Sequence, residues 1–291
     1  MRAAPECLSC FVRQALAAAR RATTDPAQRQ VILRQTLRWL AAADWRQPPP
    51  VNAAEIYRII RRLTGEADPY AAEKRRSNAL ALRLHPELRR RVAAADDPLV
   101  AALQVAVAGN IIDFGIPGFA EDASLETTVA AALTMPLDPA AVAAFRAAVA
   151  RARRILYLGD NAGEIVFDRL LLEQLPREKL AFVVRGRPVI NDATLPDTVA
   201  AGLPTLVEVI DNGADLPGTV LEYCSPAFRR RFAEADVLIA KGQGNYETLD
   251  ETDKECFFLL KVKCAAVARQ LGRELGTPCL LHHPSRPACG P

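Results

Sequence analysis

The 291-residue sequence has few aromatic residues, few glycines and no long uninterrupted hydrophobic run. Aromatic residues make up 6% of the chain although half of it is hydrophobic, so the core must be mainly alanine, leucine and valine, which favours helix. The most apolar window, 98–112, contains Gln104 and Asn110 and is too short to cross a bilayer. We expect a buried helix there and no membrane association.

Two nucleotide-binding motifs are also absent. Without a GxxxxGK[ST] P-loop, an ATP-driven reaction is not indicated. The run GDNAGE, which follows the first expected strand, lacks the GxGxxG pattern and puts an acid where a dinucleotide pyrophosphate would have to approach. A nucleotide-binding or S-adenosylmethionine-binding transferase is therefore the least favoured function that we consider.

The first residues, MRAAPECLSC, lack the apolar run of a signal peptide. The sequence has seven cysteines, an odd number that cannot all pair in disulfides within the chain. We therefore expect a reduced, cytoplasmic protein. The formal net charge is only +3 and the basic residues are scattered, so nucleic acid is not an expected partner. The sequence does not indicate an oligomeric state.

The pattern of apolar residues changes along the sequence and predicts two domains, a helical one over 1–150 and an α/β one over 151–291. Asp138 and Pro139 provide a cap and a first-turn proline for a helix over 140–153. After Arg154, short apolar runs alternate with helical patterns, which is typical of βαβ units and a mainly parallel sheet. The expected strands are 155–158, 180–184, 206–210, 236–240, 257–262 and 279–282.

Polar residues follow four of these strands. Asp160 and Asn161 come after the first, Asp192 after the second, and Asp211 after the third. Lys241 follows the fourth in a glycine-bearing run. Because the carboxyl ends of parallel strands share one edge of a sheet, we expect these side chains to meet there.

This set of residues suits phosphoryl transfer. Asp160, Asn161 and Asp192 offer three hard oxygen ligands to a divalent cation such as Mg²⁺, Mn²⁺, Co²⁺ or Ni²⁺. Lys241 and the backbone N–H groups of its loop can hold an anion. Without a P-loop, the reaction that remains is hydrolysis of a phosphomonoester. The alternative role of Asp160 is simply to cap the following helix.

Five motifs together resemble the metal-dependent damage-control phosphatases, a family long catalogued as a domain of unknown function. They are PECLSC, GNIIDFG, GDNAGEIVFD, PVINDAT and KGQGNYETL, and the CxxC in the first is similar to the shorter prokaryotic branch. The resemblance implies a multi-helical N-terminal part packed on a three-layer αβα, Rossmann-like domain. It also implies hydrolysis of small phosphorylated metabolites such as sugar phosphates or phosphopantetheine derivatives.

Matched motif by motif, the resemblance implies a role for several residues. The metal ligands are Asp160, Asn161 and Asp192. The residues placed at the phosphate are Asn110, Asp113, Lys241, Gly242 and Asn245.

Further residues have two open interpretations each. Glu164 is a candidate to orient a catalytic water, or it is a favourable charge at a helix start. Asn78 either lies on a helix that roofs the site or belongs to a polar helix face. Asp211 either lines the pocket or forms an Asx turn. The nucleophile is either a water held by the metal or the carboxylate of Asp160.

A competing function is a non-catalytic or redox-active metal-binding protein built around Cys7 and Cys10. This CxxC lies at an expected helix start, where the dipole stabilises thiolates, although two small buried residues on one helix face would look the same. Zinc would need two further ligands. The candidates for them are Cys256, Cys264, His282 and His283.

Overall fold

A single mostly parallel sheet organises the structure. The computed structural model describes residues 1–109 and 133–285. The strand order is β3-β2-β1-β4-β5-β6, and β6 runs antiparallel to β5 whereas the other neighbours are parallel. The strands are β1 Ile155–Leu158, β2 Leu180–Val184, β3 Glu208–Asp211, β4 Val237–Lys241, β5 Glu255–Lys261 and β6 Pro278–His283. The expected mainly parallel sheet is confirmed.

Helices precede the sheet and connect its strands. Before β1 come α1 Cys7–Ala22, α2 Pro26–Ala42, α3 Pro49–Thr64, α4 Ala71–Ala93, α5 Pro98–Gly109 and α7 Pro139–Arg151. Between or after the strands lie α8 Glu164–Leu172, α9 Leu195–Ala200, α10 Pro226–Glu234, α11 Gly242–Leu249 and α12 Ala265–Leu271, with short 3₁₀ turns η1 Arg177–Lys179, η2 Leu203–Thr205 and η3 Leu221–Tyr223.

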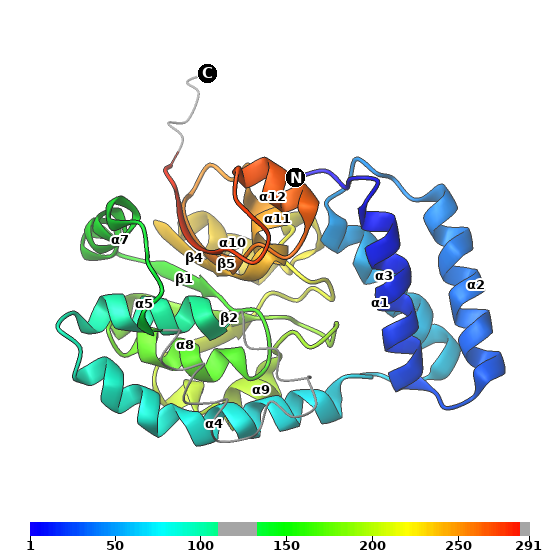
Figure 1. The fold of residues 1–291 in the computed structure, drawn as a ribbon, viewed down its shortest axis with the longest axis horizontal. Coiled ribbons are helices and arrows are strands. Elements are labelled where there is room, and N and C mark those ends of the chain that lie inside the picture. The colour runs from blue at the N-terminus through cyan, green and yellow to red at the C-terminus, as the bar shows by residue number, and fades with distance from the viewer. Residues whose placement is uncertain (110–132, 286–291) are drawn as a thin grey trace.

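The two faces of the sheet are covered by different helices, which gives three layers (Figure 1). Tyr157 and Phe182 belong to a core cluster that includes α4, α5, α7 and α8. Their strand neighbours Leu156 and Ala181 belong to a second cluster with α10, α11 and α12. This alternation follows from the two-residue period of a strand, and it confirms the αβα arrangement.

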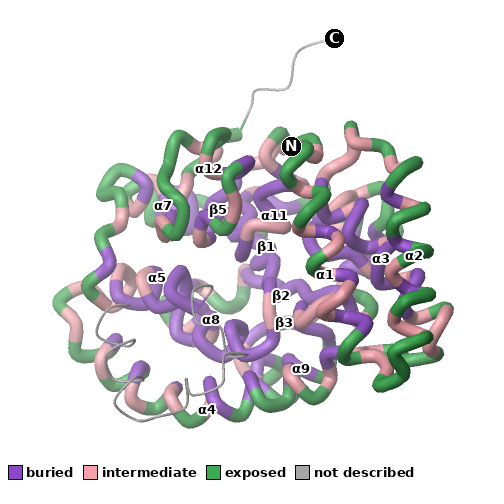
Figure 2. The backbone as a smooth tube through the Cα atoms, turned by 45° about the vertical axis from the view of Figure 1, so that its right-hand side comes forward, coloured by how far each residue is buried: buried purple, intermediate pink, exposed green. Residues whose placement is uncertain are grey.

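Helices α1 to α3 lie side by side to one side of the sheet (Figure 1). Phe11 and Ile56 share a third core cluster with Val189, which lies in the loop after β2. Figure 2 shows the inward faces of these helices buried and the outer turns of α2 exposed. The first three helices therefore pack beside the carboxyl ends of the strands. The domain boundary between residues 150 and 151 stays a prediction, because α4, α5 and α7 share a core cluster with the sheet.

Two local expectations can be compared directly with the helices. The carboxylate of Asp138 accepts a hydrogen bond from the N–H of Ala140 at 3.0 Å, and Pro139 is the first residue of α7, as expected. The apolar window beginning at Pro98 forms the buried helix α5 as far as Gly109. None of the described helices has the length and apolar character needed to cross a membrane.

Candidate active site

The loops after β1 and β2 are joined at the carboxyl edge of the sheet. Asn161 and Asp192 pair as an isolated antiparallel bridge. The N–H of Ala193 donates to the carbonyl oxygen of Asp160 at 2.8 Å. Because β1 and β2 are adjacent parallel strands, residues more than thirty positions apart meet here. Asp160, Asn161 and Asp192 are thus brought together as the sequence predicts.

The side chains of this cluster are held by each other. Asn161 Nδ2 donates to Asp160 Oδ2 at 2.9 Å and to Glu164 Oε2 at 3.1 Å. Arg185 Nε donates to Asp192 Oδ2 at 2.7 Å, while Arg185 Nη2 lies 3.8 Å from Asp160 Oδ1. Within the described residues, no hydrogen bond fills Oδ1 of Asn161 or of Asp192. Each of these two residues therefore has an oxygen available to a ligand.

Crowded negative charge raises the pKa values of the two aspartates. Burial raises the pKa of Asp160, and the nearby charges of Asp192 and Glu164 raise it further. Burial also raises the pKa of Asp192, although the guanidinium of Arg185 opposes this. The protein thus keeps carboxylates together at a cost in free energy, which is a common signature of a functional site.

Lys241 lies under this cluster rather than at its surface. Its Nζ donates to Glu164 Oε1 and to Asp168 Oδ1, both at 2.6 Å, and to the carbonyl oxygen of Ala106 at 2.7 Å. Tyr157 donates its hydroxyl to Asp168 at 2.8 Å. The Lys241 side chain is fully buried, and the two carboxylates raise its pKa to about 12 against the effect of burial. In this arrangement Lys241 fastens β4 to α5 and to the start of α8.

Asn245 supports the same region through its amide. Its Nδ2 donates to the carbonyl oxygens of Lys241 at 2.8 Å and Gly159 at 3.3 Å. Its Oδ1 accepts from Thr219 Oγ1 at 2.9 Å and from Arg185 Nη1 at 3.4 Å. Asn245 therefore ties the ends of β1 and β4 together and helps to orient Arg185.

Gly242 leaves the space that the Asp160 carboxylate occupies. Its φ is +78°, a backbone conformation that favours glycine. A Cβ built at this position would overlap the carboxylate of Asp160. Only glycine therefore satisfies both the β4–α11 turn and the position of Asp160.

Asn78 on α4 touches the turn that follows Asp160. Its Oδ1 accepts from the N–H of Gly163 at 2.6 Å, and its Nδ2 donates to Asp197 at 3.2 Å. Gly163 has a φ of +82° and precedes α8. Asn78 thus braces the Asp160–Gly163 turn from the helical part of the chain.

The remaining candidates are Asp211, Asn110 and Asp113. Asp211 is the last residue of β3, and its Oδ1 accepts from the N–H of Gly213 at 2.8 Å, which is the contact expected of an Asx turn. Asp211 does not belong to the described residues that line the cavity at the cluster. Asn110 and Asp113 lie outside the described residues.

A cavity of about 550 Å³ opens over the aspartates. Its walls come from α1, α3, α11 and the loops after β1, β2, β3 and β5, so the first helices cover the strand ends. A volume of this size suits a small metabolite. Its polar lining includes Asp160, Asn161, Asp192, Gln14, Gln243, Glu247, Arg13 and Lys263.

The CxxC lines this same cavity. Cys7 and Cys10 face it together with Cys264, whereas Cys256 is buried in β5 and the histidine pair 282–283 lies on β6, outside the described lining. Burial raises the pKa of the Cys7 thiol, which is opposite to the stabilised thiolate expected at a helix start. Within the described residues, no three His, Cys, Asp or Glu side chains are placed to hold a metal ion.

Sequence reasoning missed three charged residues of this region. Arg185 positions Asp192, Asp168 binds Lys241, and Glu247 lines the cavity. Each lies in or beside a motif already singled out. Arg185 is the first residue after β2, so the argument that selected Asp192 from a strand end would also have selected it.

Comparisons with known proteins match nearly the whole chain. A family model described as the damage-control phosphatase ARMT1-like domain covers residues 3–278. A damage-control phosphatase of Archaeoglobus fulgidus is 34% identical over 288 residues, 95% of this chain and 97% of that protein. One from Pyrococcus horikoshii is 37% identical over 274 residues, 91% of this chain and 93% of that protein. The crystal structure of a DUF89 family protein from Pyrococcus horikoshii has a TM-score of 0.88 at 32% identity, covering 97% of this chain and 99% of that one.

Proposed function

Because the chain belongs to the family of the damage-control phosphatase ARMT1-like domain, we propose that it is a metal-dependent phosphatase that hydrolyses phosphomonoesters of small metabolites. The names of its relatives support a phosphatase and hence a small phosphorylated substrate. Sugar phosphates and phosphopantetheine-like compounds are the substrate classes that we propose. Membership of the CxxC-bearing branch stays a prediction.

The observation that most supports a metal is the balance of buried charge. Asp160, Glu164, Asp168 and Asp192 are all buried, and the buried cations beside them are Arg185 and Lys241. With every group ionised, these four carboxylates and two cations, all of them described residues, carry a formal charge of −2. One divalent cation would neutralise that charge and favour the ionised form of the two aspartates, whose pKa values burial and nearby carboxylates raise.

The oxygens present fit such an ion. The two carboxylates and the amide oxygen of Asn161 are hard donors of the kind that Mg²⁺ and Mn²⁺ take, and Co²⁺ or Ni²⁺ accept oxygen as well. Because such ions take about six ligands and these residues offer three, water or substrate oxygens would complete the coordination. Arg185 holds Asp192 in place and Glu164 holds Asn161 in place. Metal ligands in proteins are commonly oriented by hydrogen bonds of this kind.

A bound divalent cation would polarise the phosphoryl group and neutralise the charge that develops in the transition state. The protein's own part is to fix the substrate in line with the nucleophile inside the cavity. That nucleophile is either water or the carboxylate of Asp160. A phosphoenzyme trapped on Asp160 would exclude direct attack by water.

Glu247 is the group that we assign to proton transfer. It lines the cavity, and burial raises the pKa of its carboxyl to about 7 although Gln243 donates to it at 2.7 Å. This carboxyl can therefore both hold and release a proton near neutral pH. Such a carboxyl can protonate the leaving alcohol as the phosphate ester bond breaks.

Hydrolysis of p-nitrophenyl phosphate by chelator-treated protein tests this proposal. We expect no turnover without metal and recovery when Mg²⁺, Mn²⁺, Co²⁺ or Ni²⁺ is added singly. Failure of all four ions to restore hydrolysis would contradict a metal-dependent phosphatase. Measuring hydrolysis of a set of sugar phosphates then tests which substrate class the protein prefers.

The competing metal-binding or redox function is tested in the same assay. Cys7 and Cys10 line the cavity but supply none of the oxygens proposed to bind the metal. We therefore expect Cys7→Ser and Cys10→Ser to keep metal-dependent turnover. Loss of bound metal from these variants alone, with the aspartates intact, would favour the cysteine-based function instead.

Replacing Gly242 by alanine tests the position of Asp160 without changing its charge. The new methyl group must displace the Asp160 carboxylate, so we expect metal-dependent turnover to fall at least about tenfold. Gly65→Ala is the matched control, since Gly65 has a φ of +72° with open space around its Cβ position. Both substitutions carry a similar backbone strain of about 1–2 kcal/mol. Equal turnover in the two variants would contradict the role given to Asp160.

A further inference from the structure

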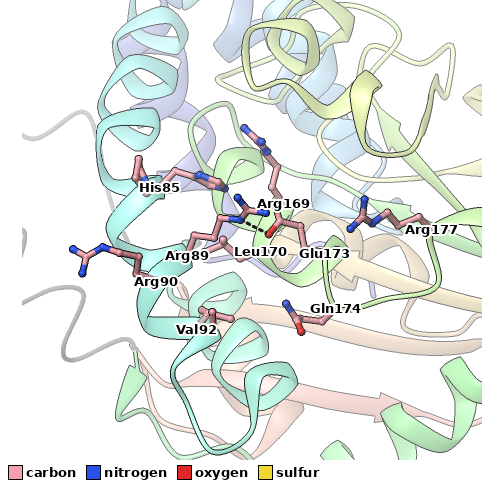
Figure 3. A pocket seen from close by; sticks show the side chains of 11 residues that line it. His85, Arg89, Arg90, Val92, Arg169, Leu170, Glu173, Gln174 and Arg177 are labelled. Carbon is pink, nitrogen blue, oxygen red and sulfur yellow. Dashed lines mark hydrogen bonds and ion pairs between the residues drawn. The ribbon is translucent and has the colours of Figure 1, made fainter.

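A second cavity lies between α4, α8 and η1, away from the aspartates. Its volume is about 730 Å³, and it shares no described lining residue with the first cavity. Figure 3 shows His85 and Arg89 extending from α4 toward α8, and Arg177 extending into the same space from the turn that follows α8. The proposed function uses none of these side chains.

The charge around this cavity is predominantly positive. Arg89, Arg169 and Arg177 line it, and Glu173 is the one acidic residue of the described lining. Arg89 Nε donates to Glu173 Oε2 at 2.8 Å, so that carboxylate is already paired. Arg90 also lines the cavity, but it pairs with Glu87, and in Figure 3 it points away from the other arginines.

Two guanidinium groups remain without a carboxylate partner in the described residues. Arg169 Nη1 donates to the carbonyl oxygen of Ala201 at 2.9 Å, while its buried Nε has no hydrogen-bond partner. Arg177 is exposed and forms no ion pair with a described residue. Both are free to bind an anion from solution.

His85 adds an unfilled polar atom to the same wall. The residue is 8% exposed, and its Nε2 has no hydrogen-bond partner. Burial, with the nearby charges of Arg169 and Arg89, lowers its pKa to about 4, so it is neutral at pH 7. Buried polar atoms are almost always paired, and an orphaned one beside an arginine cluster points to a missing ligand.

We propose that this cavity is a second anion site that binds a small phosphorylated molecule. The three arginines approach from three separate elements, α4, α8 and η1, and Arg89 uses only its Nε in the bond to Glu173. A phosphate presents oxygens in three directions and can meet all of them, whereas a carboxylate presents two oxygens in one plane. His85 Nε2 would donate to a further oxygen of the ligand. The site does not depend on the proposed catalytic activity.

Calorimetric titration of the full chain with methylenediphosphonate tests this site. The probe cannot be hydrolysed, and a chelator keeps metal from recruiting it to the aspartates. We expect saturable binding that weakens at least about tenfold in Arg177→Gln and in Arg169→Gln. Arg83→Gln, an exposed arginine of α4 outside the cavity lining, should bind as the wild type does.

The alternatives have distinct results. No saturable binding, or equal weakening by Arg83→Gln, would overturn the site. Binding that survives both Arg177→Gln and Arg169→Gln but is lost in Asp192→Asn would place the probe at the aspartates and also overturn it. Tricarballylate, a tricarboxylate, is titrated in parallel, and tighter binding of tricarballylate would overturn the assignment to phosphate. Because Arg177 is exposed, its variant reports on binding even where Arg169→Gln does not fold.

Discussion

Asp160→Asn is expected to lower metal-dependent phosphate ester hydrolysis by about a thousandfold or more, the scale seen when a group that stabilises transition-state charge is removed. Asparagine keeps the shape of the side chain and an oxygen that can accept from Asn161. It removes the negative charge that the divalent cation requires. Asp253→Asn, which changes an exposed aspartate, is the matched control and should retain full activity.

The same variant is expected to be more stable than the wild type when no metal is present. The folded-state pKa of Asp160 is raised, so its contribution to stability is present in acid and is lost as the pH rises through that pKa. The unfolding free energies should therefore agree below about pH 4, diverge as the pH rises toward about 8, and favour the variant above that pH. A loss of activity together with a gain in stability is the result expected of a metal ligand. Removing the charge of a helix cap would instead lower stability. A variant that is less stable and retains about a tenth of the activity would contradict this role.

Lys241→Met is expected to destabilise the fold by about 3–5 kcal/mol, because it removes the cation from a buried ion cluster. Glu164 and Asp168 would then face each other without solvent or a counter-charge, and the carbonyl of Ala106 would lose its donor. Urea denaturation followed by circular dichroism gives the free energy of unfolding. Methionine preserves the length of the side chain, so the change tests charge rather than volume.

A compensating variant makes this second prediction specific. Adding Asp168→Asn to Lys241→Met removes one of the two stranded charges, so the double variant should recover a substantial part of the lost stability. Arg90→Met removes an exposed cation on α4 that pairs with Glu87, and it should cost less than about 1 kcal/mol. If Lys241→Met cost no more than Arg90→Met, the buried cluster would not have the structural role described for it.

The strands and their polar ends could be predicted from the sequence because both are local signals. The apolar run 155–158 and the Asp160-Asn161 turn after it are visible in a few residues, and the parallel arrangement then brings Asp192 to the same edge. The antiparallel direction of β6 could not be predicted from the local sequence, because it depends on how the chain returns to the sheet after α12.

The partners of Lys241 could not be predicted from its position. A lysine after a glycine-bearing strand end resembles an anion-binding group, and the resemblance to the family places it at the phosphate. Its contacts with Glu164 and Asp168 arise because β4 lies beside β1 and directs the side chain under α8. Cys264 meets Cys7 at the cavity for the same reason, as segments far apart in the sequence converge only in three dimensions.

The most direct test is anomalous diffraction from crystals soaked with Mn²⁺. We expect one strong peak at about 2.0–2.3 Å from oxygens of Asp160, Asn161 and Asp192, and no such peak in Asp160→Asn. A peak among Cys7, Cys10 and Cys264 instead, or none near the aspartates at saturating Mn²⁺, would contradict the proposal that these oxygens hold the catalytic metal.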